Sequence, residues 1–412
     1  MLKMTMSPTF FARLAVASIM LQPSLNWAQT NASYAPAARI DESSLSSIID
    51  SPSVESFDLS PDGKTVALLV ATGFKAQAPL WLVTEEIATK RFTAPRQIGH
   101  LTILNSNFSP QVRYTSDQQY LVVQDFQTIR VFDSAKFAPV RTISSPSTDA
   151  SLLPLFITGA SNKDVFVCAF GSEQNLNPRF HTTPVQVEMV DISSGAVLGE
   201  WASGDVPQSI SPQGNLVAVS SLQVQRGVLP LSVVDVHGQK VTEFTGGYSF
   251  KDADQSKPTG RVIGLFMGSQ ELLLAPDENV DSTGHHSGES LQLVSMTGKI
   301  EQSIKLRHYG STGELAASAD QKTVLALSWY EPARALAHEG ALPASKPEML
   351  VLGGGTSLRL DSTIPIEGLG LRGSGWLENR RPRLSSDGSV IAVAQRSGVT
   401  VLSRNPLPSQ HP

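Results

Sequence analysis

Cysteine is almost absent from this chain of 412 residues, because Cys168 is the only one. A single cysteine excludes an intramolecular disulfide, so a packed core must hold the fold together. Cys168 lies in an apolar run typical of a buried strand, and nothing nearby suggests the basic neighbour that a reactive thiolate needs. We therefore expect Cys168 to be a buried structural residue.

Charged residues are also scarce, at 17% of the chain, and the formal net charge is −5. Lysine and arginine form no cluster, so the chain lacks the electrostatic pattern of proteins that bind nucleic acid or anionic membranes. We therefore predict no nucleic-acid partner. The 41% of hydrophobic residues is typical of a soluble protein with a packed core.

Long hydrophobic runs are missing too. A membrane-spanning helix needs about 20 apolar residues, and the longest candidate, residues 14–21, is much shorter. This run follows Lys3 and Arg13, and Ala28 offers a small residue just before Gln29. The pattern predicts a signal peptide over residues 1–28, export to the periplasm or the medium, and no transmembrane segment in the mature chain.

What the chain does contain is one short pattern that occurs seven times. It is clearest at Ser60-Pro61-Asp62-Gly63, a turn that is followed at once by the apolar run 66–70. Asp, Asn and Gly favour such tight turns. A repeat of about 50 residues built from short strands is the signature of a β-propeller, in which each repeat is one blade. The equivalent turns begin at Thr115, Ala160, Ser211, Met267, Ser318 and Ser385.

Further strand and turn signals follow in most repeats, so each repeat contains four strands. The sequence predicts an all-β fold: a seven-bladed β-propeller of four-stranded antiparallel blades over residues 51–404, which we expect to be monomeric.

The seventh repeat ends early, and an open blade edge would be prone to aggregation. Within the N-terminal segment 29–50, a stretch between about Tyr34 and Ile49 should therefore complete the last blade and close the ring. Residues 405–412 are predicted to be a disordered tail.

The repeats resemble WD-repeat-like and TolB-like propellers, whose Ser-Pro-Asp-Gly hairpin is matched in full at residues 60–63. The turns at 211–214 and 385–388 differ from it at one position each. The resemblance covers residues 50–404 and implies an exported bacterial propeller, but this fold hosts many functions. Other dipeptides stand where the WD dipeptide would be: Phe132-Asp133, Val190-Asp191 and Val234-Asp235.

The connections between strands are unequal in length. Those between the first and second strands are tight, whereas long ones occupy residues 171–183, 222–230, 276–289 and 329–346. Long loops on a rigid scaffold are where binding usually resides, and aromatic residues often anchor a partner. These loops could instead pack back onto the ring. The candidate partner-binding residues are Trp329, Tyr330, Arg334, His338, Arg179 and His181.

The polar loop of the fifth repeat is a candidate metal site. Asp277, Asn279 and Asp281 have the spacing of the first ligands of a calcium loop, and His285, His286 and Glu289 could instead hold a transition metal. Ser282 and Gly288 replace the glycine and the closing glutamate of a calcium loop. We therefore predict no cofactor, and calcium or a transition metal remains the alternative to a plain solvated loop.

Catalytic motifs give no support for a hydrolase. The nearest string to a Gly-x-Ser-x-Gly elbow is residues 247–251, where Lys251 replaces the second glycine.

Two candidate functions remain. The favoured one is a non-catalytic binding or scaffolding propeller that recognises a protein or peptide through the long loops, with no catalytic residue. The alternative is a propeller enzyme, similar to lactonases or dehydrogenases, with its site at the central channel.

Overall fold

The computed structural model describes fourteen stretches of the chain, and they all belong to one compact unit that spans residues 31–412. Among the described residues the only helix is α1 (Glu42–Leu45), so no helix there is long and apolar enough to cross a membrane. The described stretches are 34–73, 77–101, 110–125, 127–145, 152–172, 185–221, 227–244, 258–277, 290–305, 311–329, 348–354, 357–365, 382–395 and 398–404.

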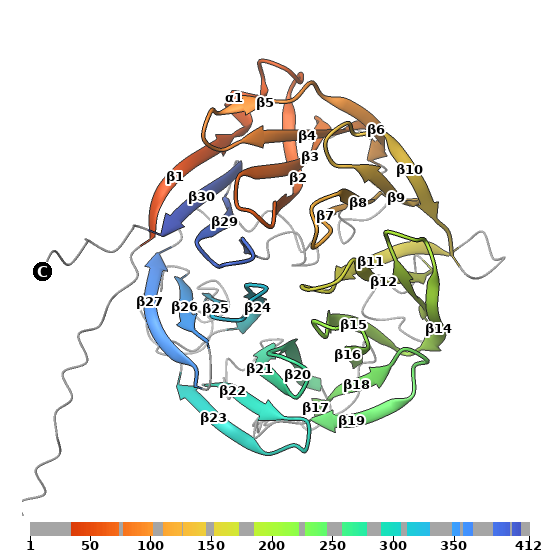
Figure 1. Ribbon diagram of the computed structural model, residues 1–412, viewed down its shortest axis with the longest axis vertical. Coiled ribbons are helices and arrows are strands. Elements are labelled where there is room, and N and C mark those ends of the chain that lie inside the picture. The colour runs from red at the N-terminus through yellow and green to blue at the C-terminus, as the bar shows by residue number, and fades with distance from the viewer. Residues whose placement is uncertain are drawn as a thin grey trace, which may run out of the picture. The chain divides into compact units, whose positions relative to one another are not determined.

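Seven antiparallel sheets surround a central axis, which confirms the predicted seven-bladed propeller (Figure 1). Blade 1 consists of β2 (Pro52–Leu59), β3 (Thr65–Thr72), β4 (Ala78–Glu86), β5 (Arg91–Phe92) and β6 (Arg96–Leu101). Blade 2 consists of β7 (Gln111–Tyr114), β8 (Tyr120–Gln124), β9 (Ile129–Asp133) and β10 (Pro139–Ile143). Blade 3 consists of β11 (Leu153–Gly159), β12 (Val165–Gly171), β13 (Val185–Asp191) and β14 (Val197–Ser203).

The remaining blades follow in chain order. Blade 4 consists of β15 (Asp205–Ile210), β16 (Leu216–Ser221), β18 (Leu231–Asp235) and β19 (Lys240–Phe244). Blade 5 consists of β20 (Pro258–Phe266), β21 (Glu271–Asp277), β22 (Ser290–Ser295) and β23 (Ile300–Lys305), and β17 (Gly227–Leu229) joins it. Blade 6 consists of β24 (Ser311–Ala317), β25 (Thr323–Trp329), β26 (Glu348–Gly353) and β27 (Arg359–Pro365).

Blade 7 is built from both ends of the chain, as the sequence predicts. The C-terminal part supplies β28 (Arg383–Leu384), β29 (Val390–Gln395) and β30 (Gly398–Arg404), and β1 (Tyr34–Asp41) adds the outermost strand. Strand β1 pairs antiparallel with β30 from Tyr34 opposite Arg404 to Asp41 opposite Gly398. The Tyr34 hydroxyl also donates to the carbonyl of Gly388 over 2.6 Å. The ring is therefore closed by backbone hydrogen bonds, and β30 has no open edge.

Blades 1 and 5 depart from the predicted four strands. In blade 1 the outermost strand is split, because β5 and β6 both pair with β4. In blade 5 the short strand β17 pairs in parallel with β20. Strand β17 lies in the connection between β16 and β18 of blade 4. An innermost strand has one unpaired edge that can accept such an addition, and the long connection reaches it.

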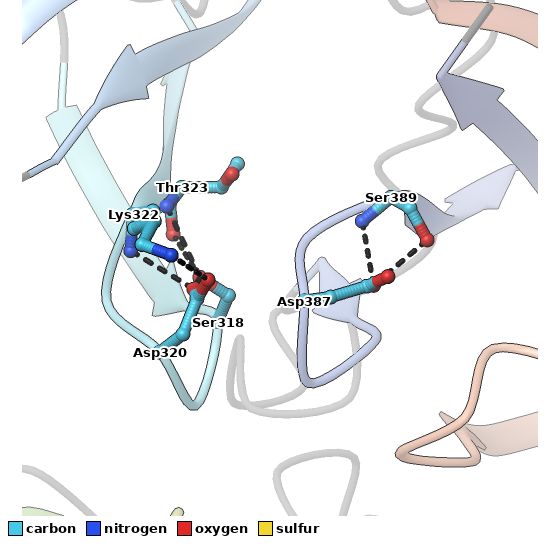
Figure 2. A network of polar contacts seen from close by, with 6 residues as sticks. All are labelled: Ser318, Asp320, Lys322, Thr323, Asp387 and Ser389. Atoms are coloured by element: carbon cyan, nitrogen blue, oxygen red, sulfur yellow. Dashed lines mark hydrogen bonds and ion pairs between the residues drawn. The ribbon is translucent and has the colours of Figure 1, made fainter. Parts of the chain in front are cut away.

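The repeated turns join the first and second strands of each blade, as predicted. In the turn at Ser318, the Ser318 hydroxyl donates to Asp320 Oδ1 over 2.7 Å and accepts from the Thr323 amide over 3.0 Å (Figure 2). The same carboxylate oxygen accepts from the Lys322 amide over 3.0 Å. The two side chains thus satisfy backbone donors that the turn would otherwise leave unpaired. The turns at Ser60, Thr115 and Ser385 repeat this arrangement.

In the turns at Ser60, Thr115, Ser318 and Ser385, one residue adopts a left-handed backbone conformation. Gly63 does so without strain at φ 71°, whereas Gln118 and Gln321 do so at φ 64° and φ 58° despite their side chains. The hydroxyl and carboxylate contacts therefore offset a local backbone cost of about 1 kcal/mol in the turns that lack glycine.

The hydrophobic core is divided into wedges between neighbouring blades. The described residues form seven buried clusters, one at each blade interface. In the wedge between blades 7 and 1, Ile40 of β1 packs with Leu68 of β3 and Val401 of β30, and all three are fully buried. Each blade thus covers a face of the next, and the ring closes only when β1 is in place.

The closing strand offers a matched pair of variants. Ile40→Ala should lower the free energy of unfolding by about 2–5 kcal/mol, because it leaves a cavity in the wedge between blades 7 and 1. Arg39 is exposed on the same strand, so Arg39→Ala should change it by less than about 0.5 kcal/mol. Urea denaturation of both variants tests closure by β1. An equally small effect of Ile40→Ala would contradict it.

Candidate functional site

A cavity of about 230 Å³ lies in the central channel, at the end where the tight turns are. All seven blades line it, through their innermost strands and the turns that follow them. One repeat position recurs in the lining, the residue two positions before each turn begins. These residues are Asp58, Arg113, Thr158, Ser209, Leu265, Ala316 and Arg383.

Three charged side chains from adjacent blades meet in this wall. Asp58 of blade 1 lies between Arg113 of blade 2 and Arg383 of blade 7. Its Oδ1 is 3.2 Å from Arg383 Nε, and its Oδ2 accepts a hydrogen bond from the Tyr114 amide over 2.7 Å. Asp58 is 7% exposed and Arg113 is 9% exposed. The group is therefore a buried ionic link across three blades.

The electrostatics of Asp58 reflect two opposed effects. Burial raises the pKa of the Asp58 carboxyl above its ordinary value, and the charges of Arg383 and Arg113 oppose this shift. Arg113 is held in place by its own strand, because its Nη1 donates to the Val112 carbonyl over 2.7 Å. The guanidinium heads are thus positioned by rigid sheet edges and not by loops, which favours a fixed geometry.

Uncharged polar side chains continue the wall in blade 4. In the pairing of β15 with β16, Pro207 lies opposite Val219 and Ser209 opposite Ala218, so Gln208 is the extra residue of a β-bulge. A bulge redirects side chains at a sheet edge, and Gln208 lines the cavity. Ser209 Oγ donates to the Gly264 carbonyl of blade 5 over 2.9 Å, which links the innermost strands of two blades.

Hydrogen bonds also join the turns beside the cavity. The Ser386 amide of blade 7 donates to the Pro61 carbonyl of blade 1 over 2.7 Å, and the Asp320 amide of blade 6 donates to the Ser386 carbonyl over 3.2 Å. With its amide nitrogen turned toward blade 6, Asn162 of blade 3 donates to the Ala319 carbonyl over 3.3 Å. The first two contacts join neighbouring blades, and the Asn162 contact joins the turns of blades 3 and 6 across the ring.

Most of the predicted site residues lie outside the described stretches of the chain. Trp329 and Asp277 are the last residues of β25 and β21. Within the described part of the chain, no three His, Cys, Asp or Glu side chains gather as a metal site would require. The predicted metal ligands therefore stay a prediction. Outside the described residues lie Tyr330, Arg334, His338, Arg179, His181, Asn279, Asp281, His285, His286 and Glu289.

Sequence reasoning missed the charged group in the channel. Asp58, Arg113 and Arg383 are far apart in sequence, yet they occupy the same position of the repeat. When the seven turns are aligned, the position two residues before each turn is charged in repeats 7, 1 and 2. A closed ring makes these three repeats neighbours, so the aligned sequence alone could have predicted that the three charged side chains lie close together.

The single cysteine is buried, as predicted, and lies opposite a buried acid. Cys168 is fully buried, and burial raises the pKa of its thiol. Glu188 of β13 pairs with Cys168 of β12 on one side and with Glu200 of β14 on the other. Within the described residues, Glu188 Oε2 has no hydrogen-bond partner. Burial, together with the charge of Glu200, raises the pKa of Glu188 to about 7.

This acid should make stability depend on pH. The folded chain binds the Glu188 proton more tightly than the unfolded chain does. The contribution of Glu188 to the free energy of unfolding is therefore greatest below pH 4.5 and is lost as the pH rises through about 7. Glu188→Gln removes the buried charge, so it should raise the melting temperature at pH 8 and leave it nearly unchanged at pH 4, below the pKa of the carboxyl in the unfolded chain. Exposed Glu86→Gln is the control and should change neither value. Thermal melts of both variants at the two pH values test this, and an equal effect at both would refute it.

Known proteins resemble this chain in fold and not in sequence. No protein-family model matches the chain, and no curated protein does. A chain in the crystal structure of a mitotic checkpoint complex aligns with 98% of this chain and 99% of its own length, with 12% sequence identity and a TM-score of 0.51. The chain thus has a WD40-like β-propeller fold.

A second solved structure supports the same fold. Hydrazine synthase from Kuenenia stuttgartiensis contains a chain that aligns with 87% of this chain and 97% of its own length, with 14% identity and a TM-score of 0.55. At such low identity the likeness shows the propeller fold alone, so the function must be argued from the site.

Proposed function

We propose that this chain is a non-catalytic binding propeller that recognises a protein or peptide partner through the end of the ring that carries the long connections. The observation that carries the proposal is the difference between the two ends of the rigid ring. Connections between the first and second strands are four or five residues long in every blade, as at 60–64 and 267–270.

Connections between the second and third strands are much longer in three blades. They span 172–184 in blade 3, 278–289 in blade 5 and 330–347 in blade 6. Strands that alternate in direction send these connections to the end opposite the tight turns. Such asymmetry is typical of scaffolds that present a binding surface on one end.

The charged group in the channel supports binding over proton-transfer chemistry. Asp58 is the only carboxylate among the described residues of the cavity lining. One of its oxygens is paired with Arg383 and the other accepts from the Tyr114 amide. A carboxylate held in this way acts as a link between blades, whereas a general base must reach the proton that it removes.

Chemical cross-linking tests which end of the ring contacts the partner. With the mature chain as bait in the exported fraction of native cells, a lysine-reactive cross-linker should join the partner to Lys75, Lys251, Lys257 or Lys346. In the sequence these lysines fall between strands whose adjoining ends face away from the tight turns. Lys64, Lys163 and Lys322 lie in tight turns at the other end and should give few cross-links. Mass spectrometry reads both sets in one sample.

A matched pair of variants separates recognition from folding. Changing Trp329 and Tyr330 to Ala should reduce the amount of partner that the bait chain captures by about tenfold or more, because aromatic anchors dominate such interfaces. Changing Lys64, Lys163 and Lys322 to Ala should leave capture intact. Cross-links concentrated on the tight-turn lysines, or capture that survives the aromatic changes, would contradict the proposal.

We also propose that the chain is exported from a bacterial cell. The support is the charged and apolar pattern of residues 1–28 and the resemblance of the repeats to exported propellers. The mature protein should therefore begin near Gln29 and appear in the periplasm or the medium. Amino-terminal sequencing of the protein from each cell fraction tests this, and an intact Met1 in the cytoplasm would refute it.

A further inference from the structure

We propose that the edge of β20 in blade 5 is a docking site for an extended segment of the partner, which replaces β17 there and runs parallel to β20. This inference rests on the binding function proposed above and specifies how the partner is held. Three features of the structure support it: β17 already occupies this edge, its pairing is weak, and the edge lies at the long-connection end.

Strand β17 is an addition to blade 5 from another blade. It lies in the connection between β16 and β18 of blade 4, yet it pairs with β20 of blade 5 (Figure 1). Residues 227–229 lie opposite residues 258–261. The backbone of β20 therefore accepts a short extended segment at this edge, which is how peptides add to a sheet in β-augmentation.

The added strand lies where the sheet of blade 5 leaves β20 incomplete. Residues 258–260 of β20 extend beyond its ladder with β21, which runs from Arg261 to Phe266. Among the described strands, β17 is the one that pairs with this extension. The backbone groups of the extension need a partner strand, and β17 provides it.

The pairing of β17 with β20 has the features of a weak and replaceable one. It covers three residues of β17, and its register is irregular between Gly227 and Val228. It is also parallel, whereas every other pairing between the described strands is antiparallel. Parallel pairs are slightly less stable for each residue, and a short two-stranded pairing is marginal.

Neither blade depends on β17 for its own sheet. Strands β16 and β18 pair directly with each other in blade 4, and β20 pairs directly with β21 in blade 5. A segment with a longer or more regular pairing could therefore displace β17 while both blades stay intact. Local opening of this kind costs little where few backbone pairs must break.

The edge lies at the end of the ring that we propose for the partner. Strand β20 runs toward the tight turn at 267–270, so its first residues lie at the opposite end, where the connection 245–257 leads into it. A segment that runs parallel to β20 must therefore enter with its N-terminal side outermost. This orientation follows from the direction of β17.

The sequence of β17 indicates the chemistry of the segment that replaces it. Residues 227–229 are Gly-Val-Leu, with no charge, and Pro230 follows them. In β-augmentation, backbone hydrogen bonds supply the affinity and the side chains supply the specificity. Proline cannot donate a backbone hydrogen bond, so it ends such a pairing. We therefore expect a short, uncharged segment of the partner that favours the extended conformation.

A synthetic peptide tests the docking edge without the partner. A fluorescent peptide with the sequence of residues 225–231 is titrated into the mature chain, and its anisotropy is measured. The tethered β17 competes with the peptide at a high effective concentration. Val228→Pro in the chain removes a backbone donor from β17, so the peptide should bind this variant about tenfold or more tightly than the wild type. Val224→Pro, in the same connection but outside β17, should leave the affinity unchanged.

A disulfide lock tests whether β17 must leave. Leu229 and Arg261 are direct partners, and strands lie about 4.8 Å apart, within the roughly 4.4–6.8 Å between Cα atoms that a disulfide accepts. The native Cys168 is fully buried. Oxidation of the Leu229→Cys and Arg261→Cys variant should abolish peptide binding and reduce partner capture by about tenfold, and reduction should restore both. Locking β1 to β30 through Arg39→Cys and Thr400→Cys should change neither.

Three results would each overturn the inference. The peptide fails to bind the Val228→Pro chain, it binds the oxidised lock as tightly as the reduced form, or the oxidised lock captures the partner as well as the reduced form does. The third result, with capture still lost on changing Trp329 and Tyr330, would leave the proposed function standing. A wild-type chain that captures no partner would instead contradict the proposed function, and the peptide titrations would still decide whether β20 has a docking edge.

Discussion

The structure depends on one constraint: each blade of the ring is apolar on both faces and has only its two neighbours to cover them. The seven buried clusters lie between blades, so no blade has a complete core of its own. A ring that stops one strand short would expose the wedge around Ile40 and the edge of β30 together. The pairing of β1 with β30 removes both problems, which is why the first described strand of the chain belongs to the last blade.

Face-to-face packing also explains where the polar contacts occur. Sheets that pack through their faces cannot share a backbone ladder, so polar side chains bridge neighbouring blades. Ser56 accepts from the Val112 amide, Asp58 accepts from the Tyr114 amide, and Gln124 donates to the Pro154 carbonyl. Near the axis the blades crowd together, and a buried polar group there needs a partner from the next blade. The ionic link of Asp58 with its two arginines is the strongest case of this general arrangement.

The two ends of the ring therefore have different properties. At one end, short turns are tied to one another by backbone hydrogen bonds and lie beside a cavity lined by all seven blades. At the other end, long connections leave the same rigid strands. A rigid ring of this kind can present a binding surface at one end while the other end stays fixed. The fold alone does not identify a function, since chains with 12–14% identity to this one occur in a mitotic checkpoint complex and in hydrazine synthase.

The sequence by itself determined the number of blades, the turns and the closing strand, because these depend on local patterns. Hydroxyl, carboxylate and glycine residues at fixed spacing specify a turn wherever they occur, and a repeat with missing strands must borrow them. Only the tertiary structure decided that Asp58, Arg113 and Arg383 meet. Their common repeat position is visible in the sequence, but their distance depends on ring closure, which makes repeats 7 and 1 neighbours. The addition of β17 to blade 5 was equally hidden, because it depends on an open strand edge that a single sequence does not locate.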